Sequence, residues 1–137
     1  ALGREPSPIE IARAVDAYLA AAVDDPNNAR LWVEVARISL RFTDAFVHRF
    51  FGSWSANSRR LLQVDMALES ALQLEPQDAD AHLLRGLRLG FWPHTDIEGA
   101  LKHLELARRP ERPTRFLFEA LIAEAFLRVH HRPLEQP

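Results

Sequence analysis

Residues 24–32 read DDPNNARLW, and residues 74–82 read LEPQDADAH. The second stretch repeats the chemistry of the first in the same order: an acid, a proline, two side chains of the Asn, Gln or Asp type, and an alanine. Proline belongs in the first turn of a helix, and Asn or Asp caps helix starts, so each stretch ends one helix and begins another. The sequence therefore contains an internal repeat whose marker is a turn between two helices.

Apolar residues recur at intervals of three and four along the segments that these turns separate, for example at Ile11, Val15 and Tyr18. No convincing run alternates apolar and polar residues between turn residues, so the pattern predicts helices alone. Ser7 and Thr95 each begin a capping-box pattern, with a glutamate three residues later. We predict six helices, over about residues 8–24, 29–51, 56–74, 79–91, 96–108 and 113–129.

Small residues mark the second helix of each pair. Ala14 and Ala21 lie seven residues apart, Ala100 and Ala107 repeat this spacing, and Ala71 lies five residues before a proline, as Ala21 does. Small side chains at these places let two antiparallel helices approach each other closely.

This arrangement resembles the tetratricopeptide repeat (TPR) family. In that family the next helix carries a Trp near its fourth position and a small residue at its eighth. Trp32 and Ala36 hold these places in one unit, and His82 and Gly86 hold them in the next. The resemblance implies an all-α, antiparallel helix-hairpin array, that is, a TPR-like α-solenoid of about six helices.

The spacing of the repeat predicts one elongated hairpin in a single domain, residues 1–137. The distance from Ala21 to Ala71 exceeds the ideal period of about 34 residues by about sixteen. The added stretch, FTDAFVHRFFGSWSANSRR, would lengthen two neighbouring helices and turn at Gly52–Ser53. The sequence begins with the second helix of a pair and closes with the first helix of another, so we also expect that it is a fragment of a longer array or an oligomer.

The resemblance implies that the first helix of each pair lines a concave binding face. Carried onto this sequence, the contact positions are Arg30, Val33, Arg37, Leu40 and Arg41 in one helix and Leu83, Leu87 and Phe91 in the next. Three guanidinium groups on one surface favour an acidic peptide or protein partner, because the guanidinium fork binds carboxylates through two hydrogen bonds. The alternative is a solvated face on which the arginines pair with neighbouring acids such as Glu34.

Aromatic residues give a second candidate surface. A stripe along the elongated hairpin either packs inside it or forms an interface, and it consists of Phe42, Phe46, Phe50, Phe51 and Trp54. The last helix is apolar at eleven of the fourteen positions from Phe116 to Val129, with Phe126 among them. A terminal repeat needs a polar outer face, so self-association, a partner or flanking repeats should cover this helix.

Composition and motifs exclude several classes of protein. Cysteine is absent, which removes disulfides, thiol catalysis and cysteine-bound zinc. The net charge of −2 argues against a general nucleic-acid binder, and no apolar stretch reaches the roughly 18 residues of a membrane span. Neither a Gly-rich phosphate loop nor an HExxH motif occurs, so we predict no metal, cofactor or catalytic site.

The predicted function is therefore that of a non-enzymatic scaffold or adaptor that binds a peptide or a partner protein. Two alternatives remain open. The long FTDAFVHRFF helix suggests a periplasmic TPR-like component that handles a small ligand for a transporter, and His94 with Glu98 suggests an enzyme. The sequence fits either cytoplasm or periplasm.

Overall fold

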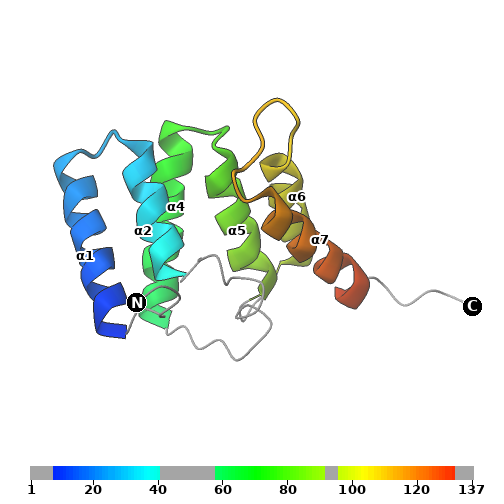
Figure 1. The fold of residues 1–137 in the computed structure, drawn as a ribbon, viewed down its shortest axis with the longest axis horizontal. Helices are drawn as coiled ribbons and strands as arrows, with labels where there is room; N and C mark the ends of the chain where they lie inside the picture. The colour runs from blue at the N-terminus through cyan, green and yellow to red at the C-terminus, as the bar shows by residue number, and fades with distance from the viewer. Residues whose placement is uncertain (1–7, 41–57, 92–95, 132–137) are drawn as a thin grey trace, which may run out of the picture. The chain divides into compact units, whose positions relative to one another are not determined.

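A computed structural model describes residues 8–40, 58–91 and 96–131 (Figure 1). Over these residues the protein is all-α, without a strand, which confirms the predicted fold class. Its helices are α1 (Pro8–Asp24), α2 (Ala29–Ser39), α4 (Ser58–Leu74), α5 (Ala79–Phe91), α6 (Ile97–Ala107) and α7 (Leu117–His131). α2 ends at Ser39, twelve residues before the predicted end at residue 51, with Leu40 as its C-cap. The rest of the predicted elongated hairpin, with its turn at Gly52–Ser53, lies outside the described residues.

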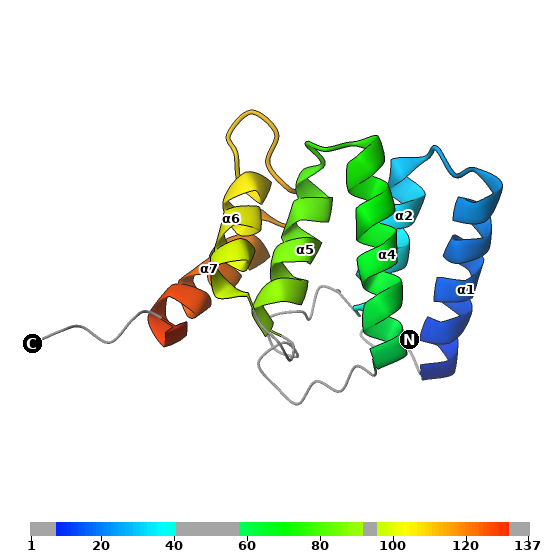
Figure 2. The same cartoon turned by 180° about the vertical axis from the view of Figure 1, so that it is seen from behind.

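The chain divides into two compact units, residues 1–76 and residues 77–137. The single domain over residues 1–137 stays a prediction. In the first unit α2 packs against both α1 and α4, and in the second unit α6 and α7 pack against α5 and against each other. The three helices of each unit can be followed from both sides in Figures 1 and 2. In the described residues each unit is therefore a stack of three antiparallel helices.

The turn between α1 and α2 is closed by one backbone bond and one side-chain cap. The N–H of Asp25 donates to the carbonyl of Ala21 over 3.0 Å, which ends α1. The Oδ1 of Asn28 accepts from the N–H of Arg30 over 3.2 Å and so satisfies a free donor at the start of α2. The DDPNN sequence therefore acts as the predicted stop and start signal.

The chain repeats this construction fifty residues later. The N–H of Glu75 donates to the carbonyl of Ala71 over 2.8 Å, as Asp25 does to Ala21. At the start of α5, the Oδ1 of Asp78 accepts from the N–H of Ala81 over 2.9 Å. The sequence repeat is thus also a repeat of hydrogen bonds.

A third turn, between α6 and α7, follows the same rule although its sequence conceals it. The N–H of Thr114 donates to the carbonyl of Ala107 over 2.7 Å, and the Thr114 hydroxyl accepts from the N–H of Phe116 over 3.2 Å. Thr114 therefore occupies the place of Asn28 and Asp78. This longer turn makes α7 begin four residues after the predicted start at residue 113.

The start of α6 differs from the prediction in a smaller way. The predicted capping residue was Thr95, but Asp96 caps the helix, and its Oδ1 accepts from the N–H of Gly99 over 2.9 Å. Asp ranks above Thr as a cap, so the stronger acceptor of two neighbours is used.

The aromatic position near the start of the first helix differs between the units. In α2 the indole N–H of Trp32 donates to the carbonyl of Pro26 over 3.0 Å, which fastens the helix to its own turn. His82 holds the same place in α5, and its Nδ1 lies 2.9 Å from the Nδ1 of His103 on α6. The same position thus closes a turn in one unit and joins two helices in the other.

Gly86 allows α5 and α6 to approach each other closely. A methyl group at this position would lie 2.8 Å from Cγ of Leu104 and 3.1 Å from the carbonyl oxygen of Ala100. Leu104 is fully buried, so its side chain has little room to move away. Gly86 therefore does in the second unit what Ala36, also fully buried, does in the first.

We expect Gly86→Ala to destabilise the protein by about 1–2 kcal/mol, because overpacking against Leu104 outweighs the roughly 1 kcal/mol that alanine gains over glycine in a helix. Denaturant unfolding followed by circular dichroism measures this change. The matched variant Ala36→Gly should also destabilise, here through lost helix propensity without any relief of crowding. A higher stability of Gly86→Ala would show that the two helices do not approach as closely as described.

Candidate functional site

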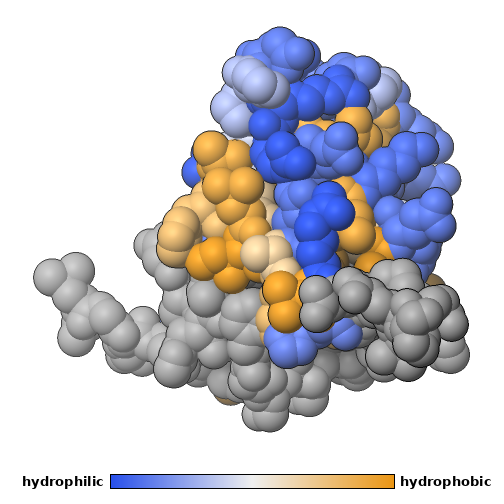
Figure 3. Space-filling model, turned by 90° about the vertical axis from the view of Figure 1, so that its right-hand side faces the viewer, coloured by the Kyte–Doolittle hydropathy of each residue, from blue (hydrophilic) through white to orange (hydrophobic). Residues whose placement is uncertain are grey.

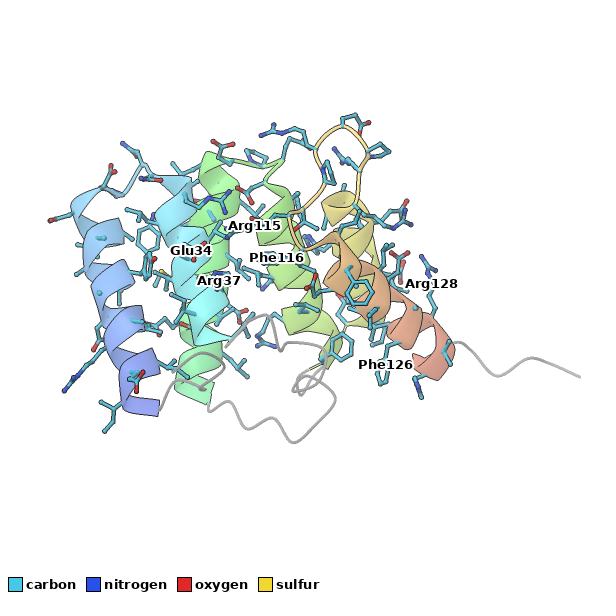
Figure 4. All side chains as sticks on the ribbon, in the orientation of Figure 1. Glu34, Arg37, Arg115, Phe116, Phe126 and Arg128 are labelled. Atoms are coloured by element: carbon cyan, nitrogen blue, oxygen red, sulfur yellow. The ribbon has the colours of Figure 1, made fainter. Side chains whose placement is uncertain are left out.

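The arginine face predicted on α2 is only partly available to a partner. Arg30 is exposed, whereas Arg41 lies outside the described residues. Arg37 forms an ion pair with Glu34, with its Nε 2.7 Å and its Nη2 2.5 Å from Oε2 of the carboxylate (Figure 4). The sequence predicts such a pairing of an arginine with Glu34 as the alternative to a partner-binding face. The pair neutralises the charge of Arg37, which was proposed to bind a partner's carboxylate.

Four apolar members of the predicted binding face are core residues. The exposed fractions of their side chains are at most 2%, and the residues are Val33, Leu40, Leu83 and Leu87. The reason is the three-and-four spacing that they share with the core positions of each helix, which turns them toward neighbouring helices. We therefore correct their assignment from ligand contacts to packing, and the two arms of the predicted groove belong to separate units.

Phe91, the last member of that face, joins an aromatic cluster in the second unit. Its ring lies 5.5 Å from that of Phe126, and Phe126 in turn lies 4.2 Å from the ring of His130, measured between centroids. Phe116 is half-buried and its ring lies under the guanidinium of Arg115, 4.7 Å from centroid to Cζ. The two phenylalanines that the sequence proposed for an interface thus have intramolecular partners.

Several other predicted residues cannot be placed. The aromatic stripe of the hairpin lies outside the described residues, as does His94, and the stripe residues are Phe42, Phe46, Phe50, Phe51 and Trp54. Glu98, the proposed partner of His94, is exposed in the first turn of α6.

Asp80 fixes the start of α7 against α5. Its Oδ1 accepts from the hydroxyl of Thr114 over 2.5 Å and from the N–H of Arg115 over 3.3 Å. Its Oδ2 lies 2.9 Å from Nε of Arg115. Because Asp80 is buried, this set of charge-assisted contacts holds the loop before α7 in one position.

Glu124 holds one edge of α7 through two arginines. Its carboxylate lies 2.7 Å from Nε of Arg108 and 2.9 Å from Nη2 of Arg128. Burial alone would raise the pKa of Glu124, but the hydrogen bonds from the two guanidinium groups lower it below its ordinary value. The same bonds raise the pKa of Arg108. This ridge of three charged side chains borders the outer face of α7.

The outer face of α7 is apolar. Figure 3 shows a hydrophobic patch over this helix beside a hydrophilic ridge. Four large side chains are exposed along it, with exposed fractions of 40% for Leu117, 66% for Phe118, 46% for Leu121 and 66% for Val129. Ala125 is exposed between them. We call these five residues the α7 face, and we regard it as the candidate site because folded proteins rarely expose contiguous apolar surface without a use.

The sequence indicated this helix but named other residues of it. Its apolar excess was evident, yet Phe116 and Phe126 were proposed for the interface instead of Phe118. The position of the capping residue in the third turn, Thr114, would have identified Phe118. With Thr114 at the capping place, Phe118 corresponds to Trp32 and His82, which are 8% and 7% exposed. Trp32 and His82 are buried at this position of their helices, whereas Phe118 is exposed at the same position of α7.

The histidine pair of the second unit is the strongest electrostatic feature away from α7. The rings of His82 and His103 are stacked, with centroids 5.2 Å apart. Burial, together with the neighbouring His82, Arg85 and Lys102, lowers the pKa of His103 from 6.5 to about 4, against the opposing influence of Asp96. A neutral pair satisfies the Nδ1–Nδ1 contact when one ring donates and the other accepts.

Within residues 8–40, 58–91 and 96–131, no group of three or more histidine or acidic side chains is arranged to hold a metal ion. No helix of the described part is long and apolar enough to cross a membrane. No family model matches the chain, and neither a curated protein nor a solved structure resembles it closely enough to count as a match.

The histidine pair makes stability depend on pH. Because folding lowers the pKa of His103, the unfolded state takes up more protons between about pH 6.5 and about pH 4. The stabilisation is complete above pH 6.5 and is lost as the pH falls toward 4. We expect the folding equilibrium constant of the wild type to fall by up to about tenfold per pH unit in this window.

Thermal or denaturant unfolding between pH 4.5 and 7 measures this dependence. His103→Gln should flatten the curve over that range, since Gln keeps polar contacts but does not titrate. Carboxylates, Glu124 among them, begin to take up protons below about pH 5 in the unfolded state, so the slope between about pH 5 and 6.5 is the part that reports His103. A slope that is unchanged in His103→Gln would mean that other groups cause the acid sensitivity.

Proposed function

We propose that this protein is a non-enzymatic, TPR-like protein-binding module and that the α7 face is its binding surface. The observation that carries the proposal is the exposure of Phe118, Leu121 and Val129 on one side of a helix whose other side is packed. Burying a large apolar side chain contributes about 1.5–3 kcal/mol, so a face with four of them is a strong driving force for association. The turn-and-helix repeat supports the TPR resemblance on which the class rests.

Charge supports a partner with acidic groups around an apolar stripe. Beside the α7 face, the side chains of Arg115 and Arg128 are 51% and 54% exposed, and Arg112 is exposed in the preceding loop. Arg115 and Arg128 each have an internal acid, yet half of each side chain still reaches solvent. A partner whose acids surround an apolar stripe would meet apolar residues at the centre and guanidinium groups at the rim, which is the usual anatomy of an interface.

This surface replaces the concave arginine face as the preferred site. On α2 the contact set is reduced to Arg30 and to Arg37, whose charge is shared with Glu34. A carboxylate of a partner would have to compete for Arg37 with Glu34, whose side chain is only 10% exposed. The α7 face offers apolar area in addition to charge.

A comparison of two variants tests which surface binds. We expect Phe118→Glu to weaken capture of partner proteins from a lysate by at least about tenfold, because a carboxylate buried in an apolar contact is strongly unfavourable. Arg37→Glu should leave capture unchanged, and Leu62→Glu, at an apolar position on α4 that is 69% exposed, is the matched control. Capture lost with Arg37→Glu and retained with Phe118→Glu would return the site to the concave face.

A further inference from the structure

The α7 face is the side of the helix that normally receives the second helix of a pair. In the second unit the corresponding position on α5 is His82, which meets α6 through His103. Phe118 stands at this position in α7 and is 66% exposed. Leu121 stands where α2 has Val35, and it is 46% exposed where Val35 is fully buried. Within its unit α7 packs against α5 and α6, so the open side is the one on which a following helix would lie.

α1 is open on the side where a second helix packs against the first helix of its pair. The hydrogen bonds to the carbonyls of Ala21, Ala71 and Ala107 align α1 with α4 and α6. In this register Ala17 of α1 corresponds to Ala67 of α4, and Ala17 is exposed whereas Ala67 is fully buried. α1 is therefore a second helix whose pairing side is open.

The same difference holds one turn away on either side. Ala14 and Ala21 are half-buried in α1. Their counterparts in the other second helices are fully buried, and these are Val64, Ala71, Ala100 and Ala107. The other side of α1 is closed, since Ile11, Val15 and Ala22 are buried. The open side is thus confined to the positions that pair with a first helix elsewhere in the chain.

We propose that α7 of one copy packs against α1 of a second copy, antiparallel, and so completes a helix pair of the same kind as α5 with α6. This inference rests on the proposed function, because it names the partner of the α7 face. The occupant is the helix in this chain that has the correct register, polarity and open side.

The α5–α6 pair supplies the geometry. His82 meets His103 there, and the same register places Phe118 of one copy opposite Ala17 of the other. The two histidines, which are equal in size, are replaced by the large Phe118 and the small Ala17. The two side chains of this proposed contact can therefore fill the space between the helices without crowding.

Ala14 and Ala21 of α1 hold the places of Ala100 and Ala107 in α6. α7 has Ile122 where α5 has Gly86, so the helices of the proposed pair lie farther apart than α5 and α6.

Charge favours the same pairing. α1 contains three acids and one arginine, namely Glu10, Asp16, Asp24 and Arg13. Residues 108–131 contain five arginines and three glutamates, which are Arg108, Arg109, Arg112, Arg115, Arg128, Glu111, Glu119 and Glu124. The antiparallel arrangement brings Asp24 toward the basic loop before α7 and Glu10 toward Arg128. Asp24 thus meets a segment of net positive charge, and this end of the contact favours the orientation over the reverse. At the other end Glu10 with Arg13 and Arg128 with Glu124 each sum to zero, so this end adds no net preference.

Such a contact is heterologous: each copy uses one surface to bind and offers a different surface to be bound. Association therefore does not stop at two copies unless the chain closes into a ring. The average mass should rise stepwise with concentration rather than reach a plateau at a dimer.

Sedimentation velocity or light scattering of the full chain over a range of concentrations tests this. We expect species larger than a monomer for the wild type. Phe118→Glu and Ala17→Glu should each raise the concentration needed for association by at least about tenfold, because each places a carboxylate in the contact. An equimolar mixture of the two variants should form a dimer and nothing larger, since only one intact α7 face meets one intact α1 face.

Two controls keep this test decisive. Val23→Glu changes an exposed residue of α1 that is not on the open side, and it should associate like the wild type. Helicity and unfolding temperature should stay close to wild type in all variants, since the substituted positions are exposed. If Phe118→Glu abolished association but Ala17→Glu did not, α7 would pair with itself and the inference would be overturned.

A wild type that stays monomeric at every concentration would also overturn the inference. The proposed function would survive that result if a captured protein still depended on Phe118. Loss of both self-association and Phe118-dependent capture would remove the function together with the inference.

Discussion

The structure depends on one recurring interaction, the closure of a turn by a backbone carbonyl at the end of one helix and a side-chain oxygen at the start of the next. Ala21 with Asn28, Ala71 with Asp78, and Ala107 with Thr114 each perform this closure. Because the closure fixes where each helix starts relative to the last, it sets the register of the buried positions that follow. Burial of the core therefore follows from the placement of polar atoms that satisfy helix ends.

The helical fold and the first two turns were predictable because their signals are local. Asp or Asn after proline is visible in the sequence, and the helices at residues 8–24 and 79–91 have the predicted bounds. The third turn was predicted, but the start of α7 was placed four residues too early. Besides its local bond to Phe116, Thr114 is held by the distant Asp80 and Ala107, which the sequence does not reveal. The burial of Val33 follows from its three-and-four spacing. The exposure of Phe118 does not, since it has the same periodicity and differs only in the neighbours that the fold supplies.

The two units show how one repeat can be stabilised by different chemistry. In the first unit an indole donates to the carbonyl of Pro26, and in the second a histidine bonds to another histidine across the helix pair. The first arrangement does not titrate near neutral pH, whereas the second contains a group whose pKa has been moved to about 4. We therefore expect the second unit to be more sensitive to acid than the first, although both are built from helices in the same way.

Asp80 gives the segment before α7 an anchor that does not depend on the length of the loop. The hydroxyl of Thr114 and the backbone and guanidinium of Arg115 bind Asp80 directly. The start of α7 is therefore held in place by α5 rather than by residues 109–113. Those five residues span the tip of the turn and are exposed. This turn is accordingly the place where evolution or an engineer can add or remove residues while the direction of α7 stays the same.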